Sequence, residues 1–142
     1  MAKILVIDDD TSLLQLIKNA LENDHNITTY TGLSNVSVRD INTHDLLILD
    51  VMMPELDGFT FLKEKRREID IPVLFLTAKN FEQDLVEGFS VGADDYMIKP
   101  FSIKELRYRI MAHLRRENRT KSNLIQFISE IFFAILQPEK FM

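Results

Sequence analysis

The sequence predicts one α/β domain built on a doubly wound parallel sheet, and three observations support this prediction. Unbroken apolar quartets at 4–7, 46–49 and 73–76 are typical of strands that are buried on both faces. Stretches with apolar residues at helical spacing lie between the apolar segments. The two patterns alternate five times, which favours parallel strands joined by right-handed helical crossovers.

The first half of the chain gives three strands and two helices. After the strand at 4–7, Thr11 and Ser12 are suitable N-caps for an amphipathic helix that extends to Leu21. The segment 27–30 is more polar, so we expect it at an edge of the sheet. The segment 33–42 is rich in Ser, Asn and Val and carries only a faint helical pattern before the strand at 46–49.

The second half repeats the same alternation. A helix follows Asp57 and Gly58, and the strand at 73–76 comes next. The segment from Phe81 to Phe89 predicts another helix, closed by Gly92, before a fifth strand at 95–98. A last helix begins after Ser102. Its apolar residues are Ile103, Leu106, Ile110, Met111 and Leu114.

Composition excludes several classes of function. The chain has 142 residues, which allows one domain and a short appendage. It has no cysteine, so disulfides, thiolate zinc sites and thiol nucleophiles are excluded. A net charge of −5 argues against the chain as a whole binding nucleic acid. No signal peptide or membrane-spanning run is evident, so we expect a cytoplasmic protein.

Polar residues follow the predicted strands at the edge where an open parallel sheet binds ligands. The strand ends carry Asp8-Asp9-Asp10, Asp50, Thr77-Ala78 and Lys99-Pro100. Taken singly, each residue has an ordinary structural role as a helix cap or a loop residue. Together they are the residue types that phosphoryl transfer uses, because clustered carboxylates suit Mg²⁺. One carboxylate is then available as a nucleophile, while Lys and Thr hold phosphoryl oxygens.

Four motifs taken in order resemble the receiver domain of two-component response regulators over about residues 3–116. They are Asp8-Asp9, the segment 50–58 with Met52, Pro54 and Gly58, Thr77-Ala78, and the segment 92–101 that contains Lys99. The resemblance implies a flavodoxin-like fold with strand order 2-1-3-4-5. It also implies a phosphorylation-dependent switch that catalyses only its own phosphorylation and dephosphorylation.

The resemblance assigns roles to individual residues. Asp50 accepts a phosphoryl group from a histidine kinase, and Mg²⁺ is the cofactor. The implied metal ligands are Asp8, Asp9, Asp50 and the backbone carbonyl of Met52. Thr77, the Ala78 amide and Lys99 contact the phosphoryl oxygens. Tyr96 is the aromatic switch residue, and Pro100 follows a cis peptide bond. Asp10 has no role of this kind, and we interpret it as an ordinary residue in the first turn of a helix.

Met52 and Lys79 occupy positions that the resemblance links to the lifetime of the phosphoryl group. Met52 has no polar group that orients an attacking water. We therefore expect a phosphoaspartate that lasts on the order of tens of minutes or more.

Glu105-Leu106, Arg109 and Arg115-Arg116 resemble the winged-helix (OmpR/PhoB-type) branch of the family. That branch forms homodimers through the fourth helix, fifth strand and fifth helix, and reaches DNA through an output domain. We expect Asp95 and Arg109 to pair across the two-fold axis, with Glu105 nearby. One departure is Leu85, which stands where a basic partner for Glu105 is usual.

We place the receiver at 1–118 and interpret 119–142 as a linker or an aberrant or truncated tail without an output domain. Nine large apolar residues between Leu124 and Leu136 would crowd one helix. The tail packs on the receiver, pairs with another copy, is disordered, or results from a frameshift from Ile135 onward.

Two other functions stay open at this point. A haloacid-dehalogenase-like phosphatase would use Asp8 as its nucleophile, since Asp8, Asp10 and Ser12 imitate its first motif. In that enzyme Thr77 and Lys99 would fill the later roles. A stand-alone receiver that acts by protein–protein contact is the second alternative.

Overall fold

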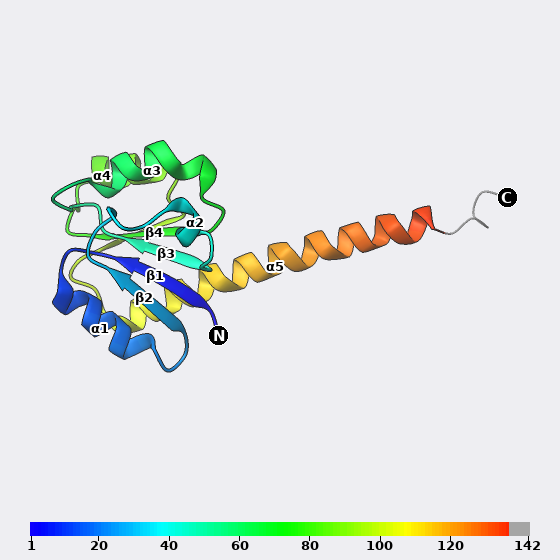
Figure 1. The fold of residues 1–142 in the computed structure, drawn as a ribbon, viewed down its shortest axis with the longest axis horizontal. Coiled ribbons are helices and arrows are strands. Elements are labelled where there is room, and N and C mark those ends of the chain that lie inside the picture. The colour runs from blue at the N-terminus through cyan, green and yellow to red at the C-terminus, as the bar shows by residue number, and fades with distance from the viewer. Residues whose placement is uncertain (137–142) are drawn as a thin grey trace.

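The computed structural model describes residues 1–136 and shows a five-stranded parallel sheet with the order β2-β1-β3-β4-β5 (Figure 1). The predicted strand order is therefore confirmed. The strands are β1 Lys3–Ile7, β2 Asn26–Tyr30, β3 Leu46–Leu49, β4 Val73–Thr77 and β5 Asp95–Ile98. The helices are α1 Thr11–Leu21, α2 Val38–Ile41, α3 Gly58–Lys65, η1 Arg66–Glu68, α4 Glu82–Ser90 and α5 Ile103–Ile135.

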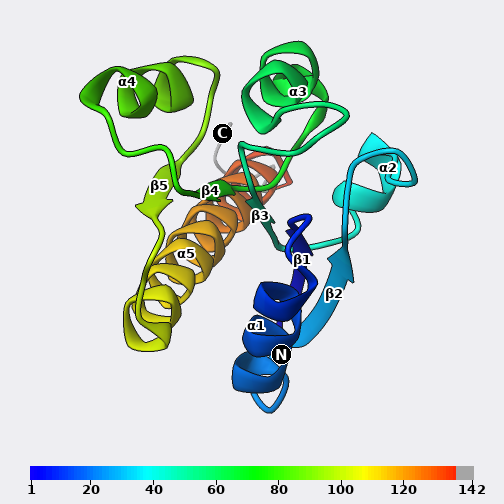
Figure 2. The same cartoon turned by 90° about the vertical axis from the view of Figure 1, so that its left-hand side faces the viewer.

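Helices cover both faces of the sheet, as Figure 2 shows, with α2, α3 and α4 on one side and α1 and α5 on the other. Alternate residues of each central strand point to opposite faces. In β1, Leu5 and Ile7 pack in the core beneath α2 and α3, while Ile4 and Val6 pack in the core beneath α1 and α5. This double burial explains why the central strands are apolar quartets, and β2 has the more polar sequence expected of an edge strand.

Local capping sets where the helices begin, and one predicted cap is wrong. Asp10 is the N-cap of α1, because its Oδ1 accepts a hydrogen bond of 3.1 Å from the Leu13 N–H. Thr11 and Ser12, which we expected as caps, therefore lie inside the helix. Ser102 caps α5 as predicted, and Asp57 caps α3, which begins at Gly58. The faint helical pattern at 33–42 gives a helix of only four residues, Val38–Ile41.

The last helix extends well beyond the sheet (Figure 1). It has 33 residues, and its first part packs on the core through Leu106 and Ile110. The predicted boundary after residue 118 lies inside this helix and stays a prediction. The apolar side chains of the protruding part are exposed: Leu124, Ile125, Phe127, Ile128, Ile131, Phe132, Phe133, Ile135 and Leu136. Residues 137–142, which hold most of the suggested frameshifted segment, lie outside the described residues.

Among the described residues, none of the helices is both long enough and apolar enough to cross a membrane.

Candidate phosphoryl-transfer site

Backbone hydrogen bonds extend the sheet past the strand ends and fix the residues of the candidate site. The Asp8 N–H donates to the Tyr30 carbonyl at 3.1 Å, and the Asp50 N–H donates to the Ile7 carbonyl at 2.9 Å. The Lys99 N–H donates in the same way to Thr77, at 2.8 Å. These residues therefore sit on a rigid edge of the sheet, at the carboxyl ends of its central strands.

Three carboxylates gather at this edge. Asp8 and Asp50 are almost fully buried, with exposed fractions of 1% and 3%, whereas Asp9 is exposed. One oxygen from each of Asp8, Asp9 and Asp50 lies within 4.8 Å of the others. Oxygen donors open to solvent on one side fit a Mg²⁺ ion that keeps several of its waters. The predicted ligand carboxylates are thus brought together.

Lys99 places the single ammonium group of this cluster between the two buried carboxylates. Its Nζ lies 2.7 Å from Asp8 Oδ2 and 3.7 Å from Asp50 Oδ2. Burial raises the pKa of Asp50 to about 6, and Asp8 adds to the rise while Lys99 opposes it. The peptide bond between Lys99 and Pro100 is cis, as predicted.

Backbone amides also point at the carboxylates and at the threonine. The Asp10 N–H donates to Asp8 Oδ1 at 2.9 Å, and the Met52 N–H donates to Asp50 Oδ1 at 3.3 Å. Thr77 is fully buried at the end of β4, and its Oγ1 accepts a hydrogen bond of 3.3 Å from the Lys79 N–H. The Asp10 carboxylate caps α1 instead of joining the cluster, so the second acid of the phosphatase motif is engaged elsewhere.

Tyr96 links β5 to the loop that follows Thr77. Its ring is buried, packs against Phe59 and Phe75 with centroid separations of 6.4 and 6.1 Å, and its hydroxyl donates to the Lys79 carbonyl at 2.8 Å. A rearrangement of the loop after Thr77 would therefore act directly on the position of the Tyr96 ring. The role of Tyr96 as a switch stays a prediction.

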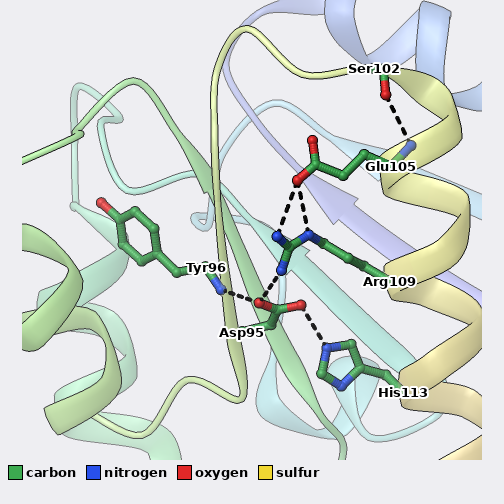
Figure 3. A network of polar contacts seen from close by, with 6 residues as sticks. All are labelled: Asp95, Tyr96, Ser102, Glu105, Arg109 and His113. Carbon is green, nitrogen blue, oxygen red and sulfur yellow. Dashed lines mark hydrogen bonds and ion pairs between the residues drawn. The ribbon is translucent and has the colours of Figure 1, made fainter.

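A second polar cluster lies between β5 and α5 (Figure 3). Arg109 Nη1 lies 2.7 Å from Asp95 Oδ1, and the same guanidinium contacts Glu105 Oε1 at 3.1 Å. In the single chain Arg109 thus pairs with its own Asp95, and the pairing across a two-fold axis stays a prediction. His113, which the sequence analysis did not single out, donates to Asp95 Oδ2 at 2.9 Å.

These contacts act on the ionisation of Asp95. Burial alone would raise its pKa, but hydrogen bonds from His113, the Tyr96 N–H and Arg109 outweigh burial and hold the pKa at about 2. Asp95 is therefore a carboxylate throughout the physiological range.

Arg66 is another residue that sequence reasoning missed. Its guanidinium donates to the carbonyls of Gly92, Ile69 and Ile71, and to Asp94 Oδ2. Gly92 has a φ of 110°, and a Cβ at this position would lie 2.5 Å from Arg66 Cγ. Gly92 thus ends α4 and also leaves room for the Arg66 side chain. The two residues are 26 positions apart in the sequence.

Comparisons with known proteins agree with this geometry. Residues 4–111 match the family described as the response regulator receiver domain. The chain is 43% identical to the transcriptional regulatory protein SpaR of Bacillus subtilis over 143 aligned residues, covering 100% of the chain and 65% of SpaR. It is 40% identical to the nisin biosynthesis regulatory protein NisR of Lactococcus lactis subsp. lactis over 131 residues, covering 91% of the chain and 57% of NisR.

A solved structure extends the likeness to three dimensions. The response regulator DrrB, described as a Thermotoga maritima OmpR/PhoB homolog, superposes with a TM-score of 0.72 at 31% identity. The match covers 82% of this chain and 54% of DrrB. The chain therefore spans between half and two thirds of these longer relatives. On the fold, the carboxylate edge and these matches, the chain belongs to the response regulator receiver family.

Proposed function

We propose that Asp50 accepts a phosphoryl group from the phosphohistidine of a histidine kinase. The observation that carries the proposal is the Lys99 ammonium lying between two buried carboxylates, Asp8 and Asp50. The Lys99 ammonium compensates the negative charge of these carboxylates and the further negative charge that a phosphoryl group on Asp50 would add.

The proposed transfer is an in-line displacement at phosphorus. An Asp50 oxygen forms the new O–P bond, the P–N bond of the phosphohistidine breaks, and its electron pair stays with the imidazole. Thr77, the Ala78 amide and Lys99 hold the phosphoryl oxygens. Asp8, Asp9, Asp50 and the Met52 carbonyl would hold Mg²⁺, which supplies charge compensation when bound.

The proposed output is a change in the face formed by α4, β5 and α5. Tyr96 joins β5 to the loop after Thr77, so an altered Thr77 loop reaches this face through a hydrogen bond of 2.8 Å. We propose that the altered face pairs with a second copy. The longer relatives are named as transcriptional regulators, which supports an output on DNA through a separate domain.

The test is incubation with acetyl phosphate and Mg²⁺, followed by intact mass measurement. Wild-type protein is expected to gain one phosphoryl group, and Asp50→Asn is expected to gain none. Asp70→Asn is the matched control, since Asp70 is an exposed carboxylate near the opposite edge of the sheet. An EDTA-treated sample should stay unmodified.

The result that would overturn the proposal is an unmodified wild-type protein, or equal modification of wild type and Asp50→Asn. Steady turnover of a phosphomonoester that is lost in Asp8→Asn would favour the phosphatase alternative instead.

A further inference from the structure

Both carboxylate oxygens of Asp95 accept hydrogen bonds within the single chain, although we expect this residue to pair with Arg109 of a second copy. Oδ1 accepts from Arg109 at 2.7 Å and from the Tyr96 N–H at 2.8 Å, and Oδ2 accepts from the His113 ring at 2.9 Å. The Asp95 side chain is only 14% exposed. At this low exposure, Asp95 would have to turn outward to bind a residue of a second copy, and such a turn would break one of its present hydrogen bonds.

His113 is the partner that a second copy cannot replace. Its side chain is 10% exposed and lies on the core side of Asp95, whereas the Arg109 side chain is 36% exposed and lies toward solvent. Figure 3 shows the carboxylate between these two groups. An Asp95 that turns outward to meet the Arg109 of a second copy would lose the hydrogen bond to His113.

The charge state of His113 sets how much that loss costs. Because Asp95 is ionised, it only accepts hydrogen bonds, so His113 Nε2 carries the proton in either ring state. A protonated imidazole gives a charge-assisted bond, which is stronger than the bond from a neutral ring. Histidine changes charge near neutral pH.

The other charged groups around His113 include both acidic and basic side chains. The surface depression that His113 lines has a volume of about 690 Å³ and carries Asp95 from β5 and Asp94, which directly precedes this strand. From α5 it carries Lys104, Glu105, Arg109 and Arg116, and Glu117 lies one turn beyond His113. Asp95 is the carboxylate in ion-pair contact with the ring.

We propose that the contact between Asp95 and His113 is an intramolecular clasp that keeps the α4-β5-α5 face in its unpaired form, most firmly when His113 is protonated. The clasp rests on the proposed function, because it regulates the pairing of two copies. A second copy must compete with the His113 imidazole of the same chain for Asp95. Acidification therefore favours the monomer, and removal of the imidazole favours the dimer.

The experiment compares dimer dissociation constants of the full chain by analytical ultracentrifugation at pH 6 and pH 8, with and without beryllofluoride and Mg²⁺. Without beryllofluoride, His113→Leu is expected to dimerise about fivefold more tightly than wild type at pH 6. Wild type is expected to dimerise at least about threefold more tightly at pH 8 than at pH 6, because a protonated imidazole gives Asp95 the stronger, charge-assisted bond. The dimer affinities of His113→Leu and His113→Gln should not change between pH 6 and pH 8.

His113→Gln separates the clasp from a general loss of packing, because the Gln amide nitrogen replaces Nε2 as a donor without titrating. It should behave like wild type at pH 8. Arg109→Ala removes the guanidinium expected to pair with Asp95 of a second copy, so any association that remains in this variant does not use the α4-β5-α5 face. The exposed apolar part of α5 is the same in every sample and does not affect the comparison.

The two proposals fail in different ways. If wild type stays monomeric with beryllofluoride, the pairing proposal is wrong and the clasp falls with it. If wild type pairs but His113→Leu and His113→Gln keep its affinity and pH dependence, the clasp alone is overturned.

Discussion

Lys99 Nζ lies 1.0 Å closer to Asp8 than to Asp50, at 2.7 Å against 3.7 Å. The ammonium is therefore paired more closely with Asp8, a proposed metal ligand, than with Asp50, the proposed acceptor. A Mg²⁺ ion that binds Asp8 would compete with this ion pair for the same carboxylate.

We predict that Lys99→Gln binds Mg²⁺ more tightly than wild type, by about threefold to tenfold, because a competing cation is removed from a partly buried site. Isothermal titration calorimetry measures the affinity. Lys104→Gln, which removes an exposed ammonium on α5, is the control and should leave the affinity unchanged. Weaker binding in Lys99→Gln would contradict the competition.

We predict that Met52→Asn shortens the lifetime of the phosphoryl group several-fold, because an amide next to Asp50 can orient an attacking water. Met52 is 54% exposed and apolar, so it provides no such group. Decay is followed by intact mass after removal of the phosphodonor. Met111→Asn makes the same change at a site that is 53% exposed on α5, and it should have the wild-type decay rate. An unchanged rate in Met52→Asn would count against the expected role of Met52.

We predict that Arg66→Ala lowers the free energy of unfolding by about 2 kcal/mol, since three carbonyls and a carboxylate lose a charged donor. Urea unfolding followed by circular dichroism measures the change. The neighbouring Arg67 is exposed, so Arg67→Ala should cost less than about 0.5 kcal/mol. Equal effects of the two variants would show that the hydrogen bonds of Arg66 do not stabilise the fold.

We predict that Asp95 stabilises the fold at neutral pH and loses this effect in acid. Its pKa in the folded chain is about 2, below the value of about 4 expected in an unfolded chain. A lowered carboxyl pKa gives stability that is present above pH 4 and is lost as the pH falls through 2. The difference in unfolding free energy between wild type and Asp95→Asn should shrink as the pH falls from 4 to 2. A difference that does not change with pH would contradict this.

We predict that the exposed apolar part of α5 drives association of the chain. Ile128→Lys places a charge among the apolar side chains and should lower the average mass measured by light scattering at high protein concentration. Asn123→Lys adds the same charge at a polar position of the same helix and should have a smaller effect. Association that is unchanged in both variants would show that this surface stays unpaired.

Hydrophobic periodicity was sufficient to predict a parallel α/β sheet because it is a local signal, whereas the strand order was implied by the resemblance to the receiver family. The quartets at β1, β3 and β4 identified the central strands, and the polar residues after them identified the site. The cap at Asp10 was missed because Asp10, Thr11 and Ser12 are all suitable N-caps, and only the backbone decides among them.

Relationships between distant residues were not predictable in this way. The contact between His113 and Asp95 spans 18 positions, and neither residue carries a local signal of the other. The Arg66 contact to Gly92 depends on the end of α3 meeting the end of α4. The direction of Arg109 toward Asp95 of its own chain depends on the angle between α5 and β5, which no periodicity specifies.

Because α5 is one uninterrupted helix, a small tilt at the end packed on the sheet becomes a large displacement at its other end. Its 33 residues correspond to a rod of about 50 Å, anchored to the sheet at one end through Leu106 and Ile110. A tilt of about 5° at the anchored end would move the far end by about 4 Å. Small changes around β5 are thus amplified geometrically at Ile135, without any change in the helix itself.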